Sequence, residues 1–355
     1  MALSRRSSSG WHSRLAPALA LALAFLGACR PDEGKPARTL ARVHAAGQFV
    51  SRVALDASGM ALLGVADRDE LQVWSLRTPE TPQVFSAPPA GPLILAEFVA
   101  PERVLATTAS GSFSEWNWLS RALTYNHKLY AQGVAAHSPD GRYLAFGGVI
   151  WDRATERDLF TMAVREQTAL EFSADGSHVL SAGRHPSQLL VGELPSGRVF
   201  QHRSSEDIRV AALNGRGDRV AASLRNGIIR LFRVPDFHLL GEFWGNSDPA
   251  GLAFLEDGEH VVTAGESCVE VHAVATGWKS FHSEVNGRIT AFYSSADLAV
   301  AGTSEGKIWI WDLAKAKTLA SAQLAPSAIR AVALSPKGRR AAAGDETGAI
   351  TVVDW

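Results

Sequence analysis

Cysteine is scarce in this chain, and so is any excess of charge of one sign. The 355 residues include two cysteines, Cys29 and Cys268, and the formal net charge is −1. Two cysteines cannot build the disulfide framework that stabilises small secreted domains. Binding to nucleic acid leaves a footprint of clustered lysine and arginine, and a balanced charge does not provide one. We therefore expect no nucleic-acid partner.

Long hydrophobic runs and helical patterns are also scarce. The apolar segment 15–28 (LAPALALALAFLGA) is too short for a transmembrane helix, which needs about 20 residues. It follows Arg5, Arg6 and Arg14, no acidic residue precedes Asp32, and it ends in small residues. This pattern predicts a secretory signal peptide over residues 1–28. The remaining chain shows no convincing amphipathic helical window, which excludes a mainly helical fold.

The end of this leader, Leu26-Gly27-Ala28-Cys29, resembles a bacterial lipobox. The resemblance implies that Cys29 carries lipid, that residues 29–37 form a short polar tether, and that the protein is held on a membrane of the bacterial cell envelope. Arg30 stands where lipoproteins of the inner membrane tend to carry aspartate, which favours the outer membrane. An ordinary secretory cleavage site before a cysteine is the alternative. With Cys29 lipidated, Cys268 is expected to be a buried structural thiol.

A strand–turn–strand unit of about 40 residues recurs over residues 38–355. The turn positions that align are Gly59, Glu102, Gly141, Gly176, Gly217, Gly258, Ala296 and Gly338. Most units continue with a third strand that ends in an aromatic residue and a more polar fourth strand. Trp74, Trp116, Trp151 and Trp311 end third strands and are expected to pack between units. Alternation with a period of two residues and short strands between Gly, Asn or Asp turns predict an all-β fold.

Several of these units resemble WD repeats. The segments that carry the resemblance are SPDG at 138–141, SADG at 173–176, SPKG at 335–338, and Trp-Asp at 151–152 and 311–312. In that family each unit forms one four-stranded blade of a β-propeller, so the resemblance implies a propeller over residues 38–355. The copies are degenerate, since the Gly-His dipeptide of the family is absent.

The unit count predicts eight blades, and seven, the commoner number in the family, is the alternative. The last unit stops at Trp355, after its third strand. Residues 39–46 (TLARVHAA) resemble residues 318–325 (TLASAQLA), which form the fourth strand of the preceding unit. We therefore expect the N-terminal strand to complete the last blade, which closes the ring and leaves no long open edge.

Catalytic and metal-binding patterns are weak. Residues 302–306 (GTSEG) match the G-x-S-x-G nucleophile elbow by letter, but KIWIW follows as a strand where the elbow needs a helix, so we predict a hairpin turn. Cys268 and His272 are spaced like half a zinc site without a second pair. We therefore predict no metal and no cofactor. The innermost strands offer Glu97, His137 and Glu171 as the candidates for chemistry in the channel.

One repeat position carries arginine more than once. It lies eight residues before the aligned turn, where the innermost strand begins, and in the WD-repeat family this end opens on the partner-binding face. The candidates are Arg209, Arg288 and Arg330, with Arg52 one residue away in the first unit. We predict that they receive an acidic segment of a protein partner; ordinary solvated charges are the alternative. Trp118, Trp244 and Trp278 fall outside the repeat frame and are candidates for an exposed partner surface.

These features together predict a membrane-anchored propeller that acts as a protein–protein interaction scaffold and is not an enzyme. An outer-membrane protein assembly factor is one alternative, because eight-bladed lipoprotein propellers serve in that role. A propeller enzyme that resembles a lactonase or a quinone-dependent dehydrogenase is another, because those families place catalytic groups near the channel.

Overall fold

A computed structural model describes residues 32–66, 70–86, 91–246, 249–335 and 337–355. These ranges contain β-strands and no α-helix, as the alternating sequence pattern predicts. It follows that none of their segments is a helix of the length and hydrophobicity needed to cross a membrane. The predicted signal peptide and Cys29 lie outside the described residues.

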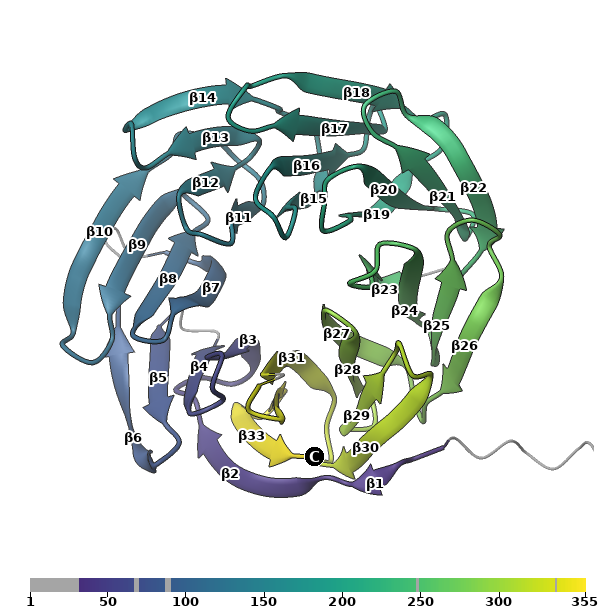
Figure 1. Cartoon of the computed structure of the whole chain (residues 1–355). Coiled ribbons are helices and arrows are strands. Elements are labelled where there is room, and N and C mark those ends of the chain that lie inside the picture. The colour runs from purple at the N-terminus through teal and green to yellow at the C-terminus, as the bar shows by residue number, and fades with distance from the viewer. Residues whose placement is uncertain (1–31, 67–69, 87–90, 247–248, 336) are drawn as a thin grey trace, which may run out of the picture. The chain divides into compact units, whose positions relative to one another are not determined.

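The strands repeat in sets of four from the centre of a ring outward (Figure 1). The innermost strands are β3 (Val50–Leu55), β7 (Leu93–Ala100), β11 (Ala135–His137), β15 (Gln167–Phe172), β19 (Ile208–Leu213), β23 (Pro249–Phe254), β27 (Ile289–Ser295) and β31 (Ile329–Ser335). The second strands are β4 (Ala61–Ala66), β8 (Arg103–Thr108), β12 (Tyr143–Phe146), β16 (His178–Gly183), β20 (Arg219–Leu224), β24 (His260–Gly265), β28 (Leu298–Thr303) and β32 (Arg340–Asp345).

Two further strands lie outside these in every set. The third strands are β5 (Leu71–Ser75), β9 (Ser112–Asn117), β13 (Val149–Asp152), β17 (Gln188–Glu193), β21 (Ile228–Arg233), β25 (Cys268–Ala273), β29 (Lys307–Asp312) and β33 (Ala349–Asp354). The outermost strands are β6 (Thr78–Phe85), β10 (Ala122–Lys128), β14 (Arg157–Thr161), β18 (Val199–Arg203), β22 (His238–Trp244), β26 (Lys279–Glu284), β30 (Lys317–Gln323) and β2 (Arg38–His44). We number the eight sheets as blades 1 to 8 in the order of their innermost strands.

Blade 8 is closed by the N-terminal strand. Its order is β2-β33-β32-β31, and β2 pairs antiparallel with β33, with Val43 opposite Ile350. The prediction of eight blades and of non-covalent closure is therefore confirmed. A shorter strand precedes β2: β1 (Lys35–Pro36) pairs in parallel with β30 at the outer edge of blade 7 (Figure 1). The N-terminal segment thus adds strands to both of the last two blades.

The hydrophobic core consists of eight clusters, and each cluster joins two neighbouring blades. The middle strands contribute most of it, because a neighbouring blade covers each of their faces; all six residues of β4 are buried. An outermost strand such as β10 is largely exposed or half-buried. The cluster that closes the ring includes Val43, Trp74 and Ile350, so closure rests on packing as well as on strand pairing.

Tryptophans at the ends of third strands lie between blades, as predicted. Trp74 and Trp311 are fully buried, and Trp116 packs against Phe85 of blade 1 with ring centroids 5.7 Å apart. The Nε1–H of Trp311 donates to Ser283 Oγ of blade 6 at 3.0 Å. These side chains therefore hold neighbouring blades together.

The G-x-S-x-G segment forms the turn between β28 and β29, as predicted. Gly306 adopts a φ of +76°, and a Cβ at this position would lie 2.0 Å from the carbonyl oxygen of Ala325. Glycine is thus required by the hairpin. The hydroxyl of Ser304 accepts a hydrogen bond from the backbone N–H of Arg288 at 3.0 Å. Ser304 therefore lies in an ordinary turn and not in a strand-to-helix elbow.

Candidate functional site

The innermost strands begin on one face of the ring, which we call the top face. In seven of the eight blades the innermost strand starts with a β-bulge, where one residue has no partner on the second strand. Arg209 and Arg330 occupy this bulge in blades 5 and 8. Arg52 follows the bulge residue of blade 1 by one position. A bulge re-aims its side chain, which makes this position suited to recognition.

Arg288 does not share that position, and the prediction of its equivalence was wrong. The bulge residue of blade 7 is Thr290, so Arg288 lies two residues earlier, before the strand. The reason is the length of the next turn: Ser294 pairs with Ala299, with four residues between them, whereas the equivalent Leu55 of blade 1 pairs with Leu62, with six between them. Counting backward from this shorter turn reaches two residues too far.

The two bulge arginines have different surroundings. Arg330 forms an ion pair with Glu346, and both side chains are half-exposed. Such exposed pairs contribute about 0–1 kcal/mol, so a carboxylate from another molecule could replace Glu346 at low cost. The Nε of Arg209 is buried, and within the described part of the chain it has no hydrogen-bond acceptor. An unsatisfied buried donor costs about 1–3 kcal/mol, which an additional acceptor would recover.

Large aromatic side chains are exposed on the same face. Phe49 directly precedes β3, Tyr130 follows β10, and Trp244 ends β22, all at the end of the blades where innermost strands begin. Tyr130 is 86% exposed and Trp244 is 70% exposed. Aromatic side chains and arginine are the residues that dominate binding energy at protein interfaces. The top face therefore combines the two kinds of side chain that a protein partner uses most.

The other two tryptophans outside the repeat frame, Trp278 and Trp118, differ in exposure. Trp278 is 77% exposed, in the turn between β25 and β26 on the opposite, bottom face. Trp118 is buried, and its Nε1–H donates to the carbonyl oxygen of Pro101 at 3.0 Å. The expectation of exposure was thus right for Trp244 and Trp278 and wrong for Trp118, because the neighbouring turn supplies a backbone acceptor for its indole.

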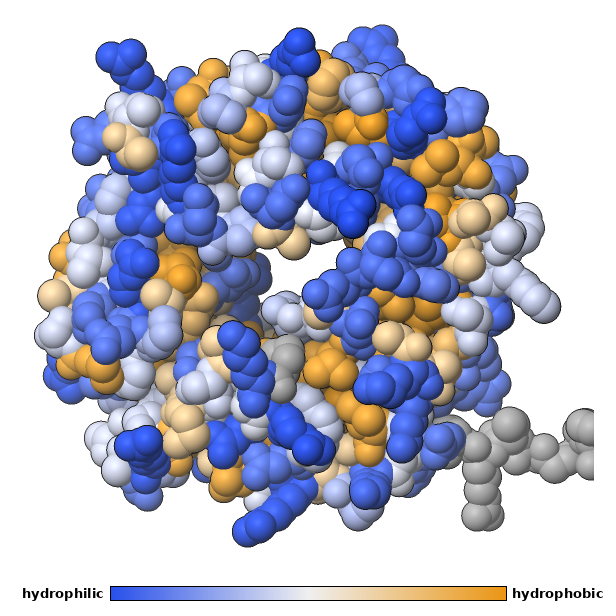
Figure 2. Space-filling view, viewed as in Figure 1, coloured by the Kyte–Doolittle hydropathy of each residue, from blue (hydrophilic) through white to orange (hydrophobic). Residues whose placement is uncertain are grey.

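The central channel holds a cavity of about 420 Å³ lined by the innermost strands of blades 1, 2, 7 and 8 and by Ala250 of blade 6. Its charged and polar lining includes Arg52, Glu97, Tyr293 and Arg330. Figure 2 shows hydrophilic side chains around the central opening. Burial lowers the pKa of the Arg52 guanidinium, and the charge of Glu97 opposes this effect. Burial, together with the charge of Glu97, raises the pKa of Tyr293.

Glu97 and His137, two of the predicted channel residues, are brought together by neighbouring blades. His137 Nε2 lies 3.0 Å from Glu97 Oε2. Burial acts to raise the pKa of Glu97, but the hydrogen bond and charge of His137 and the charge of Arg52 outweigh it, so this pKa is lowered. Burial acts to lower the pKa of His137, and the hydrogen bond and charge of Glu97 outweigh that effect and raise it. The pair therefore favours its charged form.

Glu171, the third predicted channel residue, makes a different contact. It occupies the same strand position as Glu97, opposite Leu180 as Glu97 is opposite Leu105. Its carboxylate accepts a hydrogen bond from the backbone N–H of Leu213 in blade 5. Burial raises the pKa of Glu171 to about 7, and this hydrogen bond opposes the rise. Glu171 thus links blades 4 and 5 instead of joining the Glu97–His137 pair.

Cys268 lies at the start of β25 and behaves as a neutral thiol. Burial, with a smaller effect of the charge of Glu270, raises its pKa to about 11. Such a thiol is not an activated nucleophile. The sequence pattern suggested Cys268 and His272 as half of a zinc site. The side chains whose donor atoms lie near the Cys268 sulfur are instead those of Glu270 and His282. The sequence reasoning missed these two residues, because their proximity depends on the register of β25 against β26.

The comparisons with known proteins support the fold. No protein-family model matches the chain, and no curated protein does. The C-terminal WD40 domain of Sif2 is similar, with a TM-score of 0.72 and 12% identity over 91% of this chain and 99% of that one. The crystal structure of a computationally designed protein, Ika8, is similar with a TM-score of 0.70 and 20% identity over 90% and 100%. The chain thus has the fold of a WD40-like β-propeller.

Proposed function

We propose that this protein is a lipid-anchored, non-enzymatic β-propeller of the bacterial cell envelope that binds a protein partner on its top face. The observation that carries the proposal is the combination of the bulge arginines Arg209 and Arg330 with the exposed aromatic side chains of Phe49, Tyr130 and Trp244 on one face. Arginine forms charge-assisted hydrogen bonds with carboxylates, so the favoured partner segment is acidic and also carries apolar residues.

The anchor in this proposal is lipid on Cys29, on the evidence of the lipobox-like sequence before it. One acyl chain binds a bilayer only marginally, whereas two or more chains hold a protein stably. The outer membrane is the proposed location because Arg30 follows the cysteine in place of aspartate. Membrane fractionation of cells that express the wild type and Cys29→Ala tests this part; the variant is expected in the soluble fraction.

The matched pair Trp244→Ala and Trp278→Ala tests the choice of face. Both tryptophans are mostly exposed, but Trp244 lies on the top face and Trp278 on the bottom face. In cross-linking and pull-down from envelope extracts, the partner recovered with the wild type is expected to be lost with Trp244→Ala and retained with Trp278→Ala. The double variant Arg209→Ala/Arg330→Ala is expected to recover less of the partner than the wild type. Arg198→Ala is its control, because Arg198 is an exposed arginine on the bottom face. Equal recovery with all variants would contradict the proposal.

A further inference from the structure

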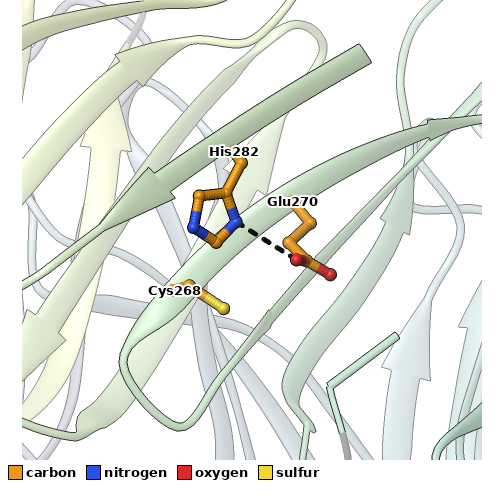
Figure 3. Close-up of side chains that lie close together, drawn as sticks. All are labelled: Cys268, Glu270 and His282. Atoms are coloured by element: carbon orange, nitrogen blue, oxygen red, sulfur yellow. Dashed lines mark hydrogen bonds and ion pairs between the residues drawn. The ribbon is translucent and has the colours of Figure 1, made fainter. Parts of the chain in front are cut away.

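Three metal-ligating side chains meet on the surface of blade 6, away from the channel. Cys268 and Glu270 come from β25 and His282 comes from β26 (Figure 3). One donor atom from each of them (the thiol sulfur, a carboxylate oxygen and an imidazole nitrogen) lies within 4.8 Å of the other two. His282 Nδ1 is 3.1 Å from Glu270 Oε1. A single ion can therefore reach all three donors after small side-chain adjustments.

The strand geometry explains why these side chains meet. Residues two apart on a strand point to the same face, so Cys268 and Glu270 share one face of β25. Glu270 pairs directly with His282, and Cys268 pairs with Glu284, which places His282 diagonally opposite the cysteine. Directly opposite and diagonal neighbours are close enough for side-chain contact. The backbone pairing of two strands thus holds the donors together, without the help of a loop.

The donor set suits a divalent transition ion. Thiolate sulfur and imidazole nitrogen favour zinc over calcium or magnesium, and a carboxylate oxygen is a third accepted zinc ligand. Three protein ligands leave one position of a tetrahedral ion for water or for a side chain of another molecule. His282 is exposed and Cys268 is half-buried, so an ion can reach the cluster from solvent.

Neighbouring groups orient these donors. His272 Nε2 lies 3.3 Å from Glu270 Oε2, the oxygen that does not face His282. Stacking on Phe243, with ring centroids 4.2 Å apart, holds the His272 ring in place. Glu284 Oε1 lies 3.8 Å from His282 Nε2, so His282 can bind an ion through Nδ1 while its other nitrogen faces a carboxylate. Contacts of this kind raise metal affinity by fixing the ligands in orientation.

A lysine contacts the same carboxylate. Lys279 Nζ lies 2.5 Å from Glu270 Oε1 and is the nearest competitor for an incoming cation. Its side chain is 45% exposed, so the ammonium group can move into solvent when the carboxylate binds an ion. The thiol would lose its proton to solvent on binding, because the thiolate is the ligand.

We propose that Cys268, Glu270 and His282 form a surface site for a divalent transition ion of the zinc class. Lys279 competes with this ion for the Glu270 carboxylate. Binding consists of proton loss from the Cys268 thiol, coordination by the three side chains, and release of Glu270 from Lys279. No redox change or further reactant is involved. The site lies at the end of blade 6 where β25 begins, and there the Cys268 thiol donates to Asn246 Oδ1 at 3.1 Å. Its fourth position is open to an exogenous ligand.

Calorimetric titration of the full chain, metal-free and in detergent, with Zn²⁺ tests the proposal. One equivalent is expected to bind. Cys268→Ser and His282→Ala are expected to weaken affinity at least 10-fold, the range seen when metal-site groups are removed, whereas Lys279→Ala is expected to tighten it several-fold. His238→Ala, an exposed histidine on β22, is the control and is expected to bind like the wild type. Cys29 is the same in all variants, so any metal binding at that residue would survive in Cys268→Ser.

Urea unfolding of each metal-free variant accompanies the titration and separates lost affinity from lost folding. A complementary readout is the charge-transfer absorption of Co²⁺ bound to thiolate, expected in the wild type and absent in Cys268→Ser. Absence of Zn²⁺ binding to the wild type would overturn the proposal. Affinity unchanged in folded Cys268→Ser or His282→Ala, or affinity lowered in Lys279→Ala, would overturn it as well.

Discussion

His137 Nε2 lies 3.0 Å from Glu97 Oε2, and this contact joins blades 2 and 3 at the wall of the channel. Each residue shifts the other toward its charged form: the pKa of Glu97 is lowered and the pKa of His137 is raised. The raised histidine pKa stabilises the fold below its ordinary value of 6.5, and this contribution is lost as pH rises through the folded-state pKa. The lowered carboxyl pKa stabilises the fold above 4.5, and this contribution is lost as pH falls.

The first prediction concerns this pair. Glu97→Gln is expected to lower the pKa of His137 below its ordinary value, because burial then acts without the compensating charge. NMR titration of the imidazole resonances measures this shift, with the other histidines of the propeller as internal references. Since Glu97 is 49% exposed, the expected loss of stability near pH 5.5 stays below about 1 kcal/mol. An unchanged His137 titration would contradict the pairing.

The second prediction concerns Glu171, whose folded-state pKa of about 7 exceeds its ordinary value of 4.5. The neutral carboxyl contributes stability below pH 4.5, and this contribution is lost as pH rises toward and through 7. Between pH 4.5 and pH 8 the wild type should lose stability relative to Glu171→Gln, on the order of 2 kcal/mol. Urea unfolding at both pH values tests this. Glu193→Gln is the control, because the Glu193 carboxyl is more exposed. A stability difference between the wild type and Glu171→Gln that does not change with pH would count against the prediction.

The third prediction concerns ring closure. Val43 is buried opposite Ile350, while the adjacent Arg42 is exposed on the same strand. Val43→Asp places a charge in the cluster between blades 8 and 1 and should cost more than about 3 kcal/mol. Arg42→Asp should change stability by less than about 1 kcal/mol. Urea unfolding and limited proteolysis at the N-terminus provide the measurements, and similar behaviour of the two variants would show that β2 does not close the ring.

The fourth prediction concerns a buried carboxylate between blades 2 and 3. Glu115 lies 3.1 Å from Arg103 and 2.9 Å from Arg153, and its side chain is almost fully buried. Glu115→Ala leaves Arg153, itself largely buried, without its carboxylate partner. Loss of one member of a buried ion pair costs about 3–5 kcal/mol. The exposed pair of Glu193 and Arg198 provides the comparison, with a loss below about 1 kcal/mol for Glu193→Ala. Equal losses would refute the assignment.

Most of the fold could be predicted from the repeat pattern because the pattern is local. Alternating apolar and polar residues identify each strand, and Gly, Asn or Asp identifies each turn. The blade count therefore followed from the spacing of the turns. The likeness of residues 39–46 to residues 318–325 was enough to place β2 beside β33. The candidate arginines followed from the same count, and the prediction failed at Arg288, where the turn of blade 7 is two residues shorter.

The sequence by itself determined the all-β class, the eight blades, the closure of the ring and the burial of Trp74, Trp116 and Trp311, because these depend on periodicity that any one repeat displays. The tertiary structure alone decided which side chains from different strands meet: Glu97 with His137, Glu171 with the backbone of Leu213, and Cys268 with Glu270 and His282. Such contacts depend on strand register and blade packing, and a shift of one residue in either would separate them.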